Sequence, residues 1–276
     1  MKISFVRPRP ELQPYIESFW VLESPTGLPA SATSIAAPNG CSKLIIPYEN
    51  SIVSVANGRT QMSYAHRMYF VGNRDSATII RSSAQKTGFI AIEFRPHGAL
   101  PIFGVPMSET SNQLWETDCM FGQWSRDVQV TLNDLERVDQ KVTYIQERLI
   151  LLLRKNRCDA GLVGYCVEAL RSADGRIPIQ ELQQRTGYSR RYLDRLFQRH
   201  VGLSPKVLAG IFRFQRFYRQ WAEGLSFDVF KAELYDYYYD QAHFTKEFRK
   251  MTGHSPGKFT RQVSNEFGRS LVRHQA

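Results

Sequence analysis

Features common in exported, membrane-bound and disulfide-linked proteins are scarce in this chain of 276 residues. Its four cysteines are scattered, so we expect neither a disulfide framework nor a cysteine zinc site. No apolar run approaches the roughly 20 residues that a membrane helix needs. The N-terminus also lacks the long apolar core of an export signal. We therefore expect a cytoplasmic protein with reduced thiols and no membrane partner.

Catalytic motifs are equally scarce. The N-terminal half has only His66 and His97, which lie far apart in sequence, whereas an open catalytic metal site needs about three protein ligands. There is no Gly-x-Ser-x-Gly elbow, phosphate-binding loop or GxGxxG fingerprint. We expect no metal, no cofactor and no enzymatic activity.

Positive charge is present in excess and is unevenly distributed. The formal net charge is +10. From Ala160 onward, 19 Lys and Arg residues stand against 11 Asp and Glu, a net of +8, whereas the first 159 residues have a net of +2. This asymmetry indicates a polyanion partner for the C-terminal part only. On charge alone, a merely soluble basic surface explains the excess nearly as well.

Two kinds of periodicity divide the chain. Up to about residue 125, short β-rich runs alternate with turn signals, a pattern typical of a barrel or double-sheet roll. Helical periodicity begins near Trp124, and everything from Ala160 onward indicates helix. The predicted fold class is α+β: an N-terminal β-rich barrel or roll with flanking helices, then an all-α domain. We place the domains at residues 1–157 and 158–265, with residues 266–276 as a tail. The predicted strands are 43–46, 51–55, 68–71, 77–80 and 88–94.

An amphipathic stripe extends from Val130 to Leu152, with apolar residues at steps of three and four. Packing within its own domain and pairing of two chains explain this stripe about equally well.

Two stretches of the C-terminal half have the same design, 51 positions apart. Each begins with a helix N-cap residue, Ser189 or Asp240, and has apolar residues four and eight positions later. Each then ends in a glycine followed by Ser-Pro, which begins the next helix at Pro205 or Pro256. Two short helices in equivalent settings, both rich in Arg, Lys and amide side chains, suggest a protein that contacts one long ligand twice.

Duplex DNA is the best candidate for that ligand. A helix over 179–185 and a tight turn at Gly187 precede the first stretch, which is the helix-turn-helix order. A helix over 205–222 joins the two units, and its 18 residues at about 1.5 Å each span about 27 Å. Successive major-groove segments on one face of DNA lie about 34 Å apart. We therefore predict that two recognition helices enter successive major grooves.

The apolar positions Leu193, Phe197, Phe244 and Phe248 are expected in the core, which leaves the other faces for DNA. Arg suits the guanine edge and Gln the adenine edge in the major groove, whereas His243 and Lys250 suit phosphate. The predicted DNA-binding residues are Ser189, Arg190, Arg191, Asp194, Arg195, Arg199, Gln241, Ala242, His243, Thr245, Lys246, Arg249 and Lys250.

The repeated block resembles the DNA-binding domain of the AraC/XylS family of bacterial transcription regulators, over about residues 160–262. The matching motifs are Gly187-Tyr-Ser-Arg-Arg-Tyr-Leu-Asp-Arg-Leu-Phe197 and Tyr239-Asp-Gln-Ala-His-Phe-Thr-Lys-Glu-Phe248, each followed by its Gly and Ser-Pro. The N-terminal half more loosely resembles the cupin-like sensor domain of such regulators, through Pro38-Asn-Gly40 and Phe94-Arg-Pro-His-Gly98.

The resemblance implies a regulator of promoter DNA whose N-terminal domain binds a small-molecule effector, mediates dimerisation, or does both. RNA polymerase and a second copy of the chain are further partners that it implies.

The chain departs from the family pattern at three positions. Gln183 and Glu233 stand where a small Ala is usual, and Tyr237 stands where the second unit normally has its turn Gly. Because a Tyr with positive φ is disfavoured, we expect a second turn of different shape and a tilted recognition helix.

For an effector cavity, the candidates are Trp20, Tyr48, Arg59, Tyr64 and Arg95, with Arg59 or Arg95 as a polar anchor. Two alternatives stay open. One is a constitutive regulator whose β-domain only mediates assembly. The other, less favoured, is a cupin-type enzyme tethered to DNA.

Overall fold

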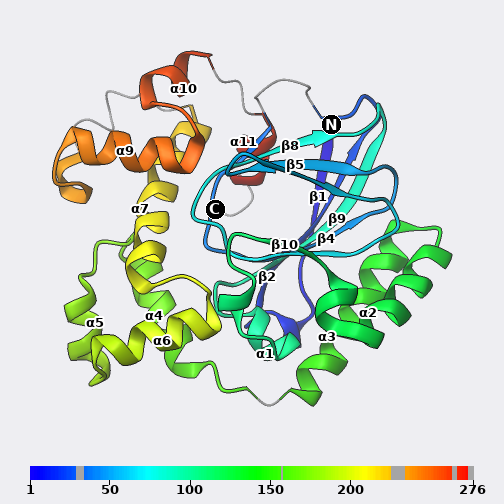
Figure 1. Cartoon of the computed structure of the whole chain (residues 1–276), viewed down its shortest axis with the longest axis horizontal. Helices are drawn as coiled ribbons and strands as arrows, with labels where there is room; N and C mark the ends of the chain where they lie inside the picture. The colour runs from blue at the N-terminus through cyan, green and yellow to red at the C-terminus, as the bar shows by residue number, and fades with distance from the viewer. Residues whose placement is uncertain (29–33, 157, 225–233, 263–265, 273–276) are drawn as a thin grey trace.

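Two structural units lie side by side in the computed structural model, a β-rich unit at the right of Figure 1 and a helical unit at its left. The structure describes residues 1–28, 34–156, 158–224, 234–262 and 266–272. The arrangement confirms the predicted α+β class.

Antiparallel pairing joins the strands of the β-rich unit into two sheets. All five predicted strands are present, with ends shifted by at most two residues. The six-stranded sheet has the order β1 (Lys2–Val6), β2 (Ile16–Ser24), β9 (Thr87–Phe94), β4 (Lys43–Pro47), β7 (Tyr69–Val71), β10 (Leu114–Glu116). The four-stranded sheet has the order β3 (Ile35–Ala36), β8 (Thr78–Ser82), β5 (Ile52–Ala56), β6 (Arg59–Ser63).

Strand β9 is buried along its whole length. Phe89 and Ala91 contact an apolar cluster that also contains Ile52 of the smaller sheet. Ile90 and Ile92 contact a separate cluster on the opposite face. The alternation follows the two-residue period of a strand, and burial on both faces explains the nearly continuous apolar run in the sequence.

Three helices, α1 (Ala99–Phe103), α2 (Thr117–Asp134) and α3 (Val138–Lys155), pack beside the second of these clusters. The apolar stripe predicted as one feature is divided between α2 and α3. Ile145 and Leu149 of α3 are fully buried, so most of the stripe packs within its own domain. Val130, on α2, is exposed.

The helical unit matches the sequence-based expectation closely. Helix α7 begins and ends at the predicted residues, and the other helices agree within one or two positions wherever a boundary was predicted. Residues 225–233, which lead from α7 into the second unit, lie outside the described residues. The helices are α4 (Gly161–Ser172), α5 (Ile179–Thr186), α6 (Arg190–His200), α7 (Pro205–Ala222), α9 (Gln241–Thr252) and α10 (Pro256–Gln262).

The C-terminus differs from the expectation of a tail. Glu266–Val272 form a further helix, α11, which returns to the β-rich unit and lies beside it in Figure 1. Phe267 is buried there, and its ring meets that of Trp20 edge-on at 6.4 Å. The guanidinium of Arg269 stacks over Trp221 of α7 at 4.4 Å. None of the helices described here has the length and apolarity that a bilayer crossing requires.

Two glycines with similar backbone angles have very different surroundings. Gly187, at the end of α5, has φ +74° and open space where a Cβ would point. Gly202, after α6, has φ +78°, but a Cβ there would lie 2.2 Å from Ser111 Oγ and 2.5 Å from the Met107 carbonyl. Gly202 therefore marks a close backbone approach between the helical and β-rich units.

This pair provides a matched test of how tightly the units dock. Gly187→Ala should cost only the left-handed backbone strain, about 1 kcal/mol. Gly202→Ala should cost roughly 2–4 kcal/mol, because the clash forces the two units apart. Thermal unfolding of the two variants would measure the difference. Equal losses of stability would contradict the docking seen here.

Candidate nucleic-acid interface and effector cavity

The first recognition helix, α6, is fixed by its N-cap and by its apolar face. Ser189 Oγ accepts a hydrogen bond from the backbone N–H of Tyr192 at 3.3 Å, which defines where the helix begins. Leu193 and Phe197 are fully buried in the core of the helical unit. The other side of α6 carries the predicted residues Arg190, Arg191, Arg195 and Arg199, all exposed, and Asp194, which is half-buried.

An open groove follows the exposed face of α6. Gln198 also lines it but was not predicted, although its spacing of four residues from Asp194 places both on one face. The exposed ion pair between Arg190 Nε and Asp194 Oδ2, at 3.8 Å, contributes little to the stability of the fold. Arg190 therefore remains available to a partner. The lining residues are Ser108, Arg190, Arg191, Asp194, Arg195, Gln198 and Arg199.

The second recognition helix, α9, repeats this design. Asp240 Oδ1 accepts a hydrogen bond from the backbone N–H of His243 at 2.7 Å, and Phe244 and Phe248 are buried. His243 Nε2 lies 3.5 Å from Glu247 Oε1, and His243 is not among the residues that line the groove of α9. The residues lining the groove of α9 are Tyr235, Asp240, Gln241, Ala242, Thr245, Lys246 and Arg249.

Lys250 stands apart from the other predicted DNA-binding residues. Its Nζ forms an ion pair of 2.7 Å with Asp75 Oδ2, which belongs to the β-rich unit. The predicted phosphate ligand is therefore engaged by the N-terminal unit in this structure.

The turn before α9 forms without a left-handed residue at Tyr237. Residues 234–237 are helical, so Tyr237 does not have the positive φ that a turn glycine would supply. Its ring packs edge-on against Phe217 at 5.5 Å, and the guanidinium groups of Arg176 and Arg216 lie over it at 5.1 and 5.2 Å. The expected strain is avoided because helix continues through the position, and cation–π contacts hold the ring. Gln183 is half-buried, and Glu233 lies outside the described residues.

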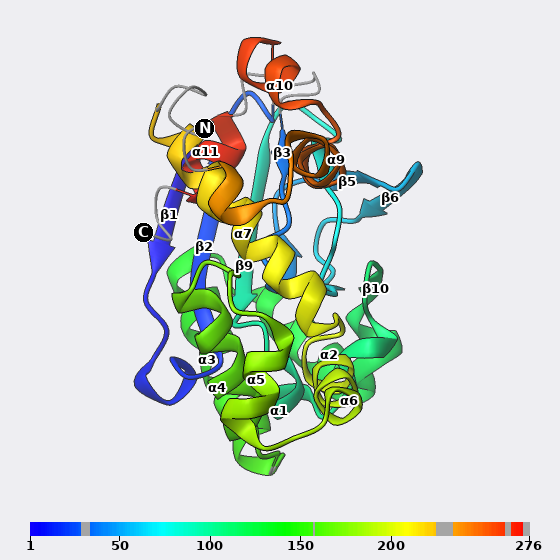
Figure 2. The same cartoon turned by 90° about the vertical axis from the view of Figure 1, so that its left-hand side faces the viewer.

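The linker helix α7 sets the two recognition helices in parallel. In Figure 2, α6 and α9 are both seen nearly end-on, one at each end of α7 and on the same side of it. In Figure 1 both run across the view, with their C-terminal ends toward the β-rich unit. This is the relative placement needed to enter successive turns of one groove.

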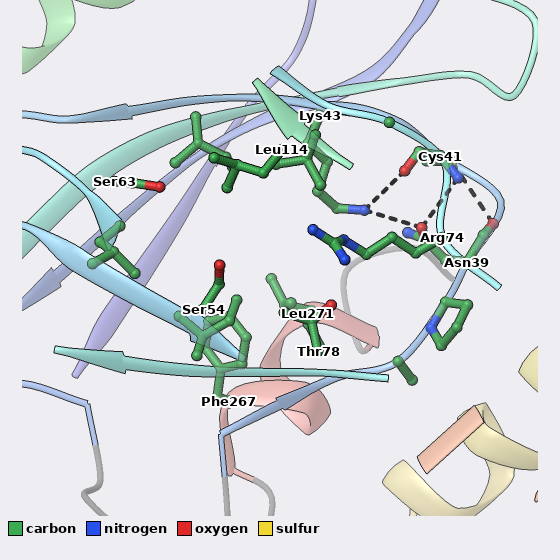
Figure 3. A pocket seen from close by; sticks show the side chains of 18 of the residues that line it. Asn39, Cys41, Lys43, Ser54, Ser63, Arg74, Thr78, Leu114, Phe267 and Leu271 are labelled. Carbon is green, nitrogen blue, oxygen red and sulfur yellow. Dashed lines mark hydrogen bonds between the residues drawn. The ribbon is translucent and has the colours of Figure 1, made fainter. Parts of the chain in front are cut away.

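A largely apolar cavity of about 100 Å³ lies between the two sheets (Figure 3). Strands of both sheets supply apolar walls, and Phe267 and Leu271 of α11 contribute to them from the far end of the chain. Two cationic side chains, Lys43 and Arg74, also line it.

These two cations differ in how their charge is balanced. Lys43 Nζ lies 3.2 Å from the buried carboxylate of Glu93 and donates hydrogen bonds to Asn39 Oδ1 and to the Cys41 carbonyl, each at 3.1 Å. Arg74 forms no ion pair within the described part of the chain. Its one hydrogen bond there is long, 3.5 Å from Nη1 to the Asn112 carbonyl, and its buried Nε has no partner. Desolvation accordingly lowers the pKa of Arg74.

Of the five candidate effector residues, only Trp20 lines this cavity. Tyr48 Oη donates to Glu23, Arg59 and Tyr64 are exposed, and Arg95 Nε donates to the Gln13 carbonyl. Sequence reasoning missed Lys43 and Arg74. The one local signal is that Asn39-Gly40 and Gly72-Asn73, residue pairs typical of turns, lie just before them.

Polar contacts connect the β-rich unit to the helical unit. Arg171 of α4 forms an ion pair of 3.1 Å with Glu17 of β2, and Gln215 of α7 donates to the Pro38 carbonyl at 2.5 Å. His97 is packed at the same boundary, with Nε2 3.2 Å from where a Cβ on Gly164 would lie. Burial, together with the charges of Arg95 and Arg171, lowers the pKa of His97 to about 4. Among the described residues, no group of three His, Cys, Asp or Glu side chains is arranged to hold a metal.

Two family models match the chain. Residues 4–116 match a domain of unknown function (DUF6597), and residues 182–262 match a helix-turn-helix domain. The second match confirms the AraC-type helix-turn-helix domain recognised from the sequence, and with it DNA binding by the C-terminal part. Among curated proteins, none matches the chain.

Solved structures give distant likenesses. ToxT from Vibrio cholerae is 10% identical, with a TM-score of 0.49, over 89% of this chain and 99% of that one. A V. cholerae ToxT with a bound unsaturated fatty acid gives 10% identity and a TM-score of 0.46, over 89% and 94%. The Clostridium difficile EutQ protein gives 13% identity and a TM-score of 0.26, over 33% and 65%.

The half-buried position of His97 leads to a prediction about acid stability. A histidine whose folded pKa is about 4 and whose ordinary value is 6.5 binds its proton more readily in the unfolded chain. As the pH is lowered from 6.5 to 4, the free energy of unfolding should therefore fall, by roughly 3 kcal/mol in total. Denaturant unfolding of the wild type and of His97→Gln across this range should show a shallower fall in the variant. Identical pH profiles would rule out a contribution from His97.

Proposed function

We propose that this chain, whose C-terminal part is an AraC-type helix-turn-helix domain, is a transcription regulator that reads promoter DNA with α6 and α9 in successive major grooves. The observation that carries the proposal is the parallel placement of the two helices at opposite ends of α7, with polar grooves along their exposed faces.

The two helices are suited to different base edges. The groove of α6 is dominated by arginines, which favour the O6 and N7 acceptors of guanine. The groove of α9 has Gln241, suited to the N6 and N7 of adenine, together with Lys246 and Arg249. The proposed site is therefore asymmetric, with one half read mainly by α6 and the other by α9.

The β-rich unit is proposed to be a sensor of a small molecule. An apolar core with no cavity would favour a constitutive regulator, whereas this core contains a cavity lined by Arg74, a cation that no carboxylate balances among the described residues. We keep the division near residue 157 as the boundary between sensor and DNA-binding domain. Pairing of two chains and contact with RNA polymerase belong to the same proposal, and the exposed apolar Val130 and Leu151 are candidate pairing residues.

The direct test is enrichment of genomic fragments by the purified full chain. Affinity for the enriched duplex would then be compared with affinity for random duplex at one salt concentration. Specific regulators of this size bind their sites about 10³-fold or more tightly than random DNA. Equal affinity for both duplexes would reject a sequence-specific reader.

Base reading by α6 is tested with two arginines on its groove and one off it. Arg195→Ala should weaken binding to the enriched duplex by about 1–3 kcal/mol and relax base preference in one half of the site. Arg190→Ala should act in the same half. Arg185→Ala is the control, because Arg185 is also exposed but lies on α5, paired with Glu181 at 2.5 Å. Unchanged specificity in both groove variants would show that α6 is placed differently on DNA.

Lys250 is tested through the salt dependence of binding. Lys250→Ala should weaken binding to all duplexes and lower the slope of log affinity against log salt by about one, because one phosphate contact is lost. A loss confined to the enriched duplex would contradict the phosphate role.

A further inference from the structure

The loop between β7 and β8, residues 72–77, has one face toward the cavity and the other toward the helical unit. Gly72, Arg74 and Ser76 line the cavity. The intervening residues Asn73, Asp75 and Ala77 contact the helical unit. Alternate residues of one short segment therefore belong to two different sites.

The contacts on the helical side involve the C-terminal ends of both recognition helices. Asn73 Nδ2 donates a hydrogen bond of 2.7 Å to the carbonyl of Val201, the C-cap of α6. The backbone N–H of Ala77 donates to the carbonyl of Lys250, in the last turn of α9, at 3.4 Å. Carbonyls at helix C-termini have no partner within the helix, so the loop supplies donors that α6 and α9 themselves lack.

The ion pair between Asp75 and Lys250 places this loop in competition with DNA. Asp75 holds Lys250 Nζ at 2.7 Å, and both side chains are partly exposed. A DNA phosphate at Lys250 would have to replace Asp75. The docked arrangement therefore withholds one cation from the DNA backbone.

On the cavity side, Arg74 has the features of an anion site. Figure 3 shows its guanidinium extending into the space between Lys43 and Leu114 on one side and Ser54 and Phe267 on the other. A guanidinium against apolar walls, with no carboxylate to balance it in the described part of the chain, gains most from an anion that brings its own apolar surface. Lys43 is already paired with Glu93.

We propose that this cavity binds an apolar monoanion at Arg74, and that loop 72–77 transmits its binding to both recognition helices. Pairing with the anion draws Arg74 further into the cavity and away from the Asn112 carbonyl, and its neighbours Asn73 and Asp75 move with it. Their contacts with Val201 and Lys250 then loosen, which frees Lys250 for phosphate and raises DNA affinity. The second half of this proposal rests on the proposed DNA-binding function.

The site is tested on the full chain by titration calorimetry with octanoate, and with 1-octanol as a probe of similar size without the charge. Octanoate should bind the wild type and 1-octanol at least tenfold more weakly. Arg74→Gln should weaken octanoate binding at least tenfold, whereas Arg81→Gln, an exposed cation on β8, should not change it. No octanoate binding by the wild type, or equal binding by Arg74→Gln, would overturn the site.

The coupling is tested by the affinity for the enriched duplex with and without octanoate. Octanoate should raise the affinity of the wild type about tenfold, within the range usual for allosteric coupling. Asp75→Asn should start at raised affinity, bind octanoate normally and gain little more from it. The matched control is Asp139→Asn, because Asp139 also forms an exposed ion pair, with Arg137 at the start of α3. This variant should behave as the wild type. Octanoate that binds without changing the affinity of the wild type would overturn the coupling.

A readout without DNA separates this proposal from the proposed function. Amide hydrogen exchange in residues 72–77 and in the last turns of α6 and α9 should speed up when octanoate binds. If exchange changes as expected but no duplex is preferred, the coupling stands and the proposed DNA function fails. If exchange in those segments is unaffected by bound octanoate, the coupling fails whatever the DNA result.

Discussion

The burial of α7 is the constraint on which the rest of the structure depends. Residues on nearly every side of this helix are buried, including Leu208, Phe214 and Trp221. One side supports both helix-turn-helix units, and another meets the β-rich unit, where Leu208 packs so closely on Gly40 that a Cβ there would lie 2.6 Å from it. A helix fixed by three neighbours cannot rotate without moving all of them, so the spacing of α6 and α9 and the docking of the β-rich unit are set together.

The boundary between the two units combines polar contacts with apolar ones, such as Ile35 of β3, which packs into the core of the helical unit. It depends on side chains that donate to backbone carbonyls, as Gln215, Asn73 and Ser111 do, and on the ion pairs of Arg171 and Lys250. Such contacts exchange with water at modest net cost, unlike a continuous apolar core. Interfaces of this kind within one chain are suited to relative motion of the domains. The packing therefore combines a buried α7 with a boundary whose polar contacts can exchange with water.

Local chemistry was enough to predict much of this fold. The Ser204-Pro205 cap gave the start of α7, and the Asn57-Gly58 turn lies between β5 and β6 with φ of +50° and +73°. The apolar faces of α6 and α9 could be predicted equally well. The conformation at Tyr237 could not, because its ring is held by Arg176 and Arg216, which are distant in sequence. The cavity was missed for the same reason: Trp20, Arg74 and Phe267 meet only through tertiary packing, and α11 has no sequence motif that marks it as a wall.

The return of α11 has a consequence for how the protein is made. A ribosome makes the strands of the β-rich unit first, yet one wall of its cavity consists of Phe267 and Leu271, which follow the whole helical unit in the chain. Until α11 arrives, Trp20 has the ring of Phe89 beside it but lacks that of Phe267, and the apolar pocket is unfinished. Nascent chains and fragments that end before α11 would therefore have an incomplete cavity. The unit whose strands are translated first is completed only after the helical unit has been made.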